Sequence, residues 1–168
     1  GKRLKSIFDK KDSGTTFIPN AFLQISPDNS IKVILAHVEM GQGIWTTLSM
    51  LIADELDADW KDITAEHAPA DQAYAHTVWH IQATGGSTTT WSEFDRYRKA
   101  GAAARILLVQ AAANKWGIPA DQCKTENGFV ISGNNKLSYG QLAESAAAIT
   151  PHTDIPLKTK DQWKYIGK

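Results

Sequence analysis

The chain has 168 residues, no net charge and 42% hydrophobic residues, which is the composition of a single soluble globular domain. Because acidic and basic residues balance, the composition excludes a protein that binds nucleic acid through a basic surface. One cysteine excludes an internal disulfide and a cysteine-cluster metal or iron–sulfur site, and no apolar run is long enough to span a membrane.

The first part of the chain predicts a β-hairpin followed by a helix. Residues 1–16 are polar and aperiodic, so we expect a flexible leader there. Strand-forming residues over 21–26 and 31–37 flank a Pro-Asp-Asn-Ser turn, which predicts a hairpin. An amphipathic helix then follows, with one apolar face and one acidic face. The apolar face carries Trp45, Leu48, Ile52 and Leu56, and the acidic face carries Asp54, Glu55 and Asp57.

The middle of the chain predicts one long helix. A short strand over 62–67 precedes a long irregular segment over 68–83, and long irregular segments inside compact domains are often functional. Residues 87–116 then predict a single helix, for which Ser87 or Thr88 is a suitable N-cap. Glycine and proline directly after this pattern predict where the helix ends.

The last part predicts a second hairpin and a short helix. An Asn-Gly turn at 127–128 and a Gly-Asn-Asn turn at 133–135 flank strand-forming residues over 129–131. Ser138 and Gln141 have the spacing of a capping box, which predicts a helix from there to Ala148.

The order of these elements predicts an α+β fold, with a mixed β-sheet and helices mainly on one face. We divide the chain into the leader over 1–16, a folded segment over 17–150 and a polar tail over 151–168.

Two glycine-rich segments carry the functional signal. The first is Val38-Glu39-Met40-Gly41-Gln42-Gly43, and the second is Ala83-Thr84-Gly85-Gly86-Ser87-Thr88-Thr89-Thr90. Each precedes a predicted helix, whose free N–H groups attract anions, and glycine lets a ligand approach the backbone closely. The second segment adds five hydroxyl groups, although it lacks the lysine of a P-loop. Both segments therefore predict contact with a phosphate-bearing ligand. The alternative is that they serve only as a tight turn and a helix cap.

Other reactive side chains point to structural roles. His76 and His80 could share a metal on a helix, but no third ligand is near and the segment is not helical in pattern, so we expect loop histidines. Glu39 could act as a general base, but a carboxylate next to a helix N-terminus is stabilising by itself. Cys123 has no base beside it, so we do not expect a nucleophile. We assign no catalytic residue and no metal ligand.

With these segments the sequence resembles the molybdenum-binding large subunit of the xanthine dehydrogenase and aldehyde oxidase family, and within it the isoquinoline 1-oxidoreductase beta-subunit branch. The resemblance covers residues 17–168. It is carried by Pro19-Asn20-Ala21-Phe22, both glycine-rich segments, Leu51-Ile52-Ala53-Asp54-Glu55-Leu56, Ala100-Gly101-Ala102-Ala103-Ala104-Arg105, Glu126-Asn127-Gly128 and Leu137-Ser138-Tyr139-Gly140-Gln141-Leu142.

The resemblance implies that both segments hold molybdopterin, in this branch as its cytosine dinucleotide. The residues it places at the cofactor are Met40, Gly41, Gln42, Gly43, Thr84, Gly85, Gly86, Ser87 and Thr89. A cofactor with many hydrogen-bonding atoms suits such neutral, amide-rich loops.

The resemblance also implies an N-terminal piece of a longer large subunit. The parent would oxidise an N-heterocycle or an aldehyde with water as the oxygen source, and pass electrons to a small iron–sulfur subunit. The family's glutamate base and the glycine loop near its metal have no counterpart here, so the piece alone is expected to be inactive and empty of cofactor. A periplasmic parent, exported by a twin-arginine leader, is implied, with a cytoplasmic one as the alternative.

Two other interpretations remain open at this point. The chain could be a stand-alone module that binds a phosphate or nucleotide without redox activity. It could also be a structural domain in which the glycines only form turns. Titration with cytidine nucleotides separates these two, because only the module should bind.

Overall fold

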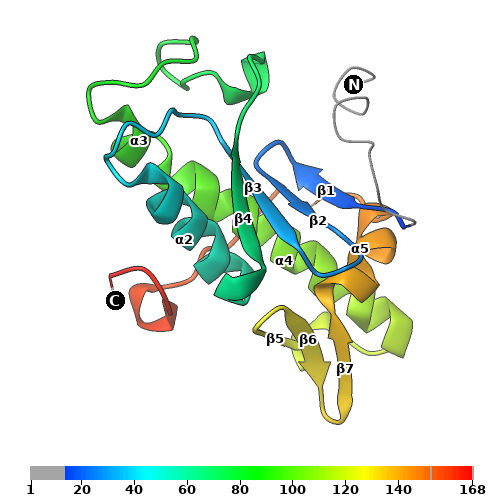
Figure 1. Cartoon of the computed structure of the whole chain (residues 1–168). Coiled ribbons are helices and arrows are strands. Elements are labelled where there is room, and N and C mark those ends of the chain that lie inside the picture. The colour runs from blue at the N-terminus through cyan, green and yellow to red at the C-terminus, as the bar shows by residue number, and fades with distance from the viewer. Residues whose placement is uncertain (1–13, 152, 168) are drawn as a thin grey trace.

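A four-stranded mixed sheet forms one layer of the fold (Figure 1). The computed structural model describes residues 14–151 and 153–167, so most of the expected leader lies outside the described residues. The strands are β1 (Phe17–Asn20), β2 (Leu23–Ile25), β3 (Ile31–Leu35) and β4 (Ile63–His67). β1, β2 and β3 pair antiparallel, whereas β3 and β4 pair parallel. The hairpin and the mixed character of the sheet are confirmed, while β1 was not predicted.

The helices gather mainly on one face of this sheet, which confirms the α+β prediction. They are α2 (Ile44–Leu56), α3 (Thr88–Trp91), α4 (Phe94–Trp116) and α5 (Tyr139–Ala147). Single 3₁₀ turns lie at Trp60–Asp62, Gln72–Tyr74, Ala120–Gln122 and Lys160–Gln162. Gly101 lets α4 approach α2 closely, since a Cβ there would lie 2.8 Å from the carbonyl oxygen of Ile52. None of the helices within 14–151 and 153–167 is both long and apolar enough to cross a bilayer.

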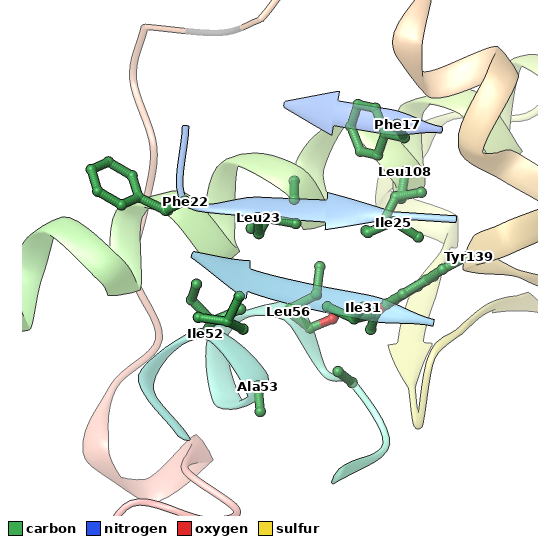
Figure 2. Close-up of a cluster of buried hydrophobic side chains, with 14 of the residues drawn as sticks. Phe17, Phe22, Leu23, Ile25, Ile31, Ile52, Ala53, Leu56, Leu108 and Tyr139 are labelled. Carbon is green, nitrogen blue, oxygen red and sulfur yellow. The ribbon is translucent and has the colours of Figure 1, made fainter. Parts of the chain in front are cut away.

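The hydrophobic core lies between this sheet and the helices (Figure 2). Leu23 of β2 and Ile31 of β3 belong to one core cluster with Ile52 and Leu56 of α2 and Leu108 of α4, and all five are at most 1% exposed. Full burial of one such side chain stabilises the fold by about 1.5–3 kcal/mol. The core therefore fixes β3 and α2, which the first glycine-rich segment connects.

A second, antiparallel sheet contacts the helices α4 and α5. It consists of β5 (Lys124–Glu126), β6 (Phe129–Ser132) and β7 (Asn135–Ser138), in that order. The hairpin of β6 and β7 and the capping box of α5 are confirmed, with Ser138 accepting from the Gln141 N–H. β5 was not predicted.

The prediction of one helix over 87–116 is wrong. The chain forms the short helix α3, turns at Ser92 and Glu93, and begins α4 at Phe94. Ser87 has a left-handed conformation with φ of 57° and makes no side-chain cap. The break brings the Glu93 side chain into the protein interior, where it is fully buried.

The acidic face predicted for α2 is also buried in part, because the tail lies over it. The carboxylate of Asp54 accepts from the backbone N–H groups of Lys164, Tyr165 and Ile166, at 2.7–3.1 Å. Glu55 pairs with Arg98 at 2.8 Å. Asp54 and Glu55 are 1% and 0% exposed, because the tail covers both carboxylates.

Candidate functional site

The two glycine-rich segments lie side by side. We call residues 38–43 loop 1 and residues 83–90 loop 2. Loop 1 connects β3 to α2, and loop 2 leads from the irregular segment into α3. The backbone N–H of Val38 donates to the hydroxyl oxygen of Thr84 at 2.9 Å, which joins the loops directly.

A cavity of about 410 Å³ opens between the loops. It is lined by Met40, Gln42, Ile44, Thr47, Thr84, Gly85, Ser87, Thr89 and Thr90. Six of these residues were predicted site residues, and the sequence missed Ile44, Thr47 and Thr90. The predicted residues Gly41, Gly43 and Gly86 belong to the loops but do not line the cavity.

The amides of loop 1 are occupied by the loop's own carboxylate. Glu39 accepts from the N–H groups of Gly41 at 2.7 Å, Gly43 at 3.0 Å and Trp45 at 3.2 Å. The bonds from Trp45 and Gly43 contribute most to a pKa of Glu39 below its ordinary value. Gly43 has φ of 81°, a conformation that side chains disfavour, so glycine is needed for this arrangement. In this conformation the amides of Gly41, Gly43 and Trp45 are therefore bonded to Glu39, and contact of loop 1 with a ligand stays a prediction.

Gln42 braces loop 1 in the same way. Its Oε1 accepts from the Met40 N–H at 2.6 Å, and its Nε2 donates to the carbonyl oxygen of Val38 at 2.8 Å. An amide nitrogen carries two hydrogens, so one N–H of Gln42 remains for a ligand. The Met40 side chain, 69% exposed, supplies an apolar contact at the cavity.

Loop 2 supplies the free donors of the site. Among the described residues, none accepts a hydrogen bond from the backbone N–H groups of Gly86, Ser87 and Thr89. Ser87, Thr89 and Thr90 line the cavity, and their hydroxyl groups likewise bond to no described residue. Neutral donors on residues that line one cavity fit a phosphate or another oxygen-rich group.

The aromatic side chains of Trp79 and Trp91 contact loop 2 at Gly86. The indole N–H of Trp91 donates to the carbonyl oxygen of Gly86 at 3.2 Å, and a Cβ at Gly86 would lie 3.6 Å from the Trp79 ring. Trp79 stacks on His76 with ring centroids 4.6 Å apart. His76 accepts from two backbone N–H groups through Nδ1, and no group of three metal-ligating side chains occurs within 14–151 and 153–167. His76 and His80 are loop residues, not a helical metal pair.

The start of α4 anchors the strand that leads into loop 1. The hydroxyl group of Tyr97 donates to the carbonyl oxygen of Ile34 and accepts from the N–H of Ala36, both at 2.8 Å. Tyr97 is fully buried and lies on the first turns of α4. No sequence pattern indicates this role, because only the fold brings α4 to the end of β3.

This pair of loops on a mixed sheet agrees with the comparison to known families. Residues 6–167 match the family of the molybdopterin cofactor-binding domain. The chain belongs to this family. Isoquinoline 1-oxidoreductase subunit beta of Brevundimonas diminuta is 40% identical over 131 residues, which cover 76% of this chain and 17% of that protein. The membrane-bound aldehyde dehydrogenase of Gluconacetobacter polyoxogenes, whose name specifies pyrroloquinoline quinone, is 33% identical over 90% of this chain and 20% of its own length.

A solved structure shares the fold. The copper- and molybdenum-containing carbon monoxide dehydrogenase matches with a TM-score of 0.57 and 21% identity, over 73% of this chain and 16% of that one. The chain thus spans a fifth or less of the proteins that it resembles.

Proposed function

We propose that loops 1 and 2 hold the molybdopterin cofactor in the large subunit of a molybdenum hydroxylase. The observation that carries this proposal is the cavity between the loops, which is lined by Ser87 and Thr89 of loop 2, whose N–H groups bond to no described residue. Family membership supports the same cofactor class.

The residues at the cavity fit this cofactor. Among the described residues, no lysine or arginine lines the cavity, so a phosphate would be held by the hydroxyl groups of Ser87 and Thr89 and by the N–H group of Ser87. A hydrogen bond to a charged group contributes about 1.5–3 kcal/mol, so several neutral donors can replace a cation. The flat pterin ring would pack on the Met40 side chain and accept from the remaining N–H of Gln42.

The reaction belongs to the bound cofactor, which would supply the oxidation of an N-heterocycle or an aldehyde with water as the oxygen source. The names of the relatives, an isoquinoline oxidoreductase and an aldehyde dehydrogenase, support these two substrate classes. The role of this chain is to bind and orient the cofactor through loops 1 and 2. We further propose the cytosine dinucleotide form, a small iron–sulfur subunit as electron acceptor and a periplasmic location.

The rest of the large subunit would cover the apolar rim around the loops. Large apolar side chains are exposed in loop 1, in the segment before loop 2 and at the end of α3, and include Met40, Val78, Trp79, Ile81 and Trp91. Exposed apolar patches of this kind mark interaction sites. The segment over 17–150 would then be the cofactor-binding part, and the tail over 151–168 would lead to the next domain.

Cofactor content of the full-length large subunit tests the proposal. The variants Ser87→Ala and Thr89→Val remove a hydroxyl group without breaking a hydrogen bond of the protein, and Gln42→Ala removes the amide from loop 1. Combining Ser87→Ala with either of the other two should lower molybdopterin content at least several-fold. Thr46→Val, an exposed position on α2 outside the cavity, is the matched control. Unchanged molybdenum and pterin content in these double variants would refute the assignment.

A further inference from the structure

A buried cluster of charged and polar side chains lies at the roots of both loops. Glu93 is 0% exposed and His37 is 3% exposed. His37 directly precedes loop 1, and Glu93 follows α3, the helix that loop 2 enters. The proposed cofactor contacts use neither residue.

Within this cluster, one carboxylate oxygen collects three partners. Glu93 Oε1 lies 3.4 Å from His37 Nε2, accepts from the Ser92 hydroxyl group at 3.1 Å and lies 3.4 Å from Arg96 Nη1. Burial raises the pKa of Glu93, but the bond from His37 and the charge of Arg96 outweigh it, so the pKa lies below its ordinary value. Glu93 is therefore a carboxylate whose charge is balanced inside the protein.

Arg96 extends the cluster to the segment that leads into loop 2. Its guanidinium group donates to the carbonyl oxygens of Ala73 at 2.6 Å and Ala75 at 3.1 Å, and lies over the ring of Phe22 at 4.6 Å. Three parts of the chain thus meet at Glu93: the end of β3, the segment before loop 2 and the break between α3 and α4.

We propose that Glu93 is a positioning residue, which sets the separation of loops 1 and 2 through His37 and Arg96. A buried carboxylate that loses its partners is costly, so Glu93 favours the arrangement that keeps His37 Nε2 and the Arg96 guanidinium group beside it. Val38, which donates the bond to Thr84, directly follows His37 in the sequence. The consequence for the cofactor rests on the proposed function, whereas the separation of the loops does not.

The amide of Val38 reports this separation, because its hydrogen bond spans the two loops. In the 168-residue chain, Glu93→Gln should speed NMR-detected hydrogen exchange at Val38 by roughly tenfold relative to Leu108 in the core helix. The matched control is Glu55→Gln, a second fully buried carboxylate that pairs with an arginine but lies away from the loops. It should leave the ratio of the two exchange rates unchanged.

Variants of His37 keep the test decisive if Glu93→Gln does not fold. His37→Gln retains a donor for Glu93 and should preserve slow exchange at Val38, whereas His37→Leu should reproduce the acceleration. The proposal is overturned if exchange at Val38 rises no more than at Leu108, or if Glu55→Gln has the same effect. A parent protein without molybdopterin would overturn the proposed function and leave this exchange result standing.

Discussion

The backbone N–H of Val38 and the hydroxyl oxygen of Thr84 lie 2.9 Å apart, although 46 residues separate them in the chain. This bond joins loop 1 to loop 2, so the two glycine-rich segments form a single site. β3 leads into loop 1, which connects it to the start of α2. The bond from the Trp91 indole N–H to the Gly86 carbonyl oxygen holds loop 2 beside loop 1. Everything proposed for the site depends on this juxtaposition.

Removing the acceptor of this bond should loosen the site. Thr84→Val keeps the shape of the side chain but leaves the Val38 N–H without its partner, at a cost of about 0.5–1.5 kcal/mol to the closed arrangement. We expect several-fold less cofactor in the full-length large subunit, measured as molybdenum and pterin per chain. Thr84→Ser retains the hydroxyl group and should bind normally. Equal cofactor content in the two variants would show that the bond is dispensable.

The pH dependence of loop 1 should follow Glu39. Its pKa in the folded chain lies below the ordinary 4.5, because the N–H groups of Trp45, Gly43 and Gly41 stabilise the carboxylate. A lowered folded-state pKa gives stability that is present above pH 4.5 and is lost as the pH falls through the folded-state value. A ¹³C NMR titration of the side-chain carboxyl group should therefore give a midpoint below 4.5, with the loop 1 amide signals moving at the same pH. Glu39→Gln should abolish that step, and a midpoint at or above 4.5 would speak against the carboxylate as the cap of loop 1.

The contact between α2 and α4 should not tolerate a methyl group at position 101. A Cβ on Gly101 would lie 2.8 Å from the Ile52 carbonyl oxygen and 3.2 Å from the Glu55 Cβ, so Gly101→Ala must push the helices apart. Overpacking of this kind costs about 1–3 kcal/mol, even though alanine is the better helix former. Urea denaturation measures the change in the free energy of unfolding. Lys99→Ala, at an exposed position of the same helix, should be nearly neutral. If Gly101→Ala were as stable as the unsubstituted chain, α2 and α4 would be able to move apart without loss of stability.

Much of the fold follows from local sequence patterns. The hairpin of β2 and β3, the helix α2 and the capping box of α5 were predicted because alternation, helical spacing and turn residues act within a few positions. β1 and β5 escaped prediction because each is only three or four residues long and exists through pairing with a neighbour. The break between α3 and α4 depends on partners of Glu93 that are distant in sequence, so the helical pattern of residues 87–116 could not reveal it.

The candidate site divides in the same way. Its location was predictable, because glycines and hydroxyl residues at two helix starts are visible in the sequence. A structural role for Glu39 was also predicted, but not that its carboxylate bonds the amides of loop 1 and leaves loop 2 as the source of free donors. Asp54 and Glu55 show the same limit, because they are buried only where the tail folds back over α2.

The molybdenum and pterin content of the native protein, measured together with its intact mass, tests the central claim most directly. We predict a chain several times heavier than 18.4 kDa that carries about one molybdenum and one pterin. A native protein that lacks molybdenum, or that carries pyrroloquinoline quinone in its place, would contradict the assignment of loops 1 and 2 to molybdopterin.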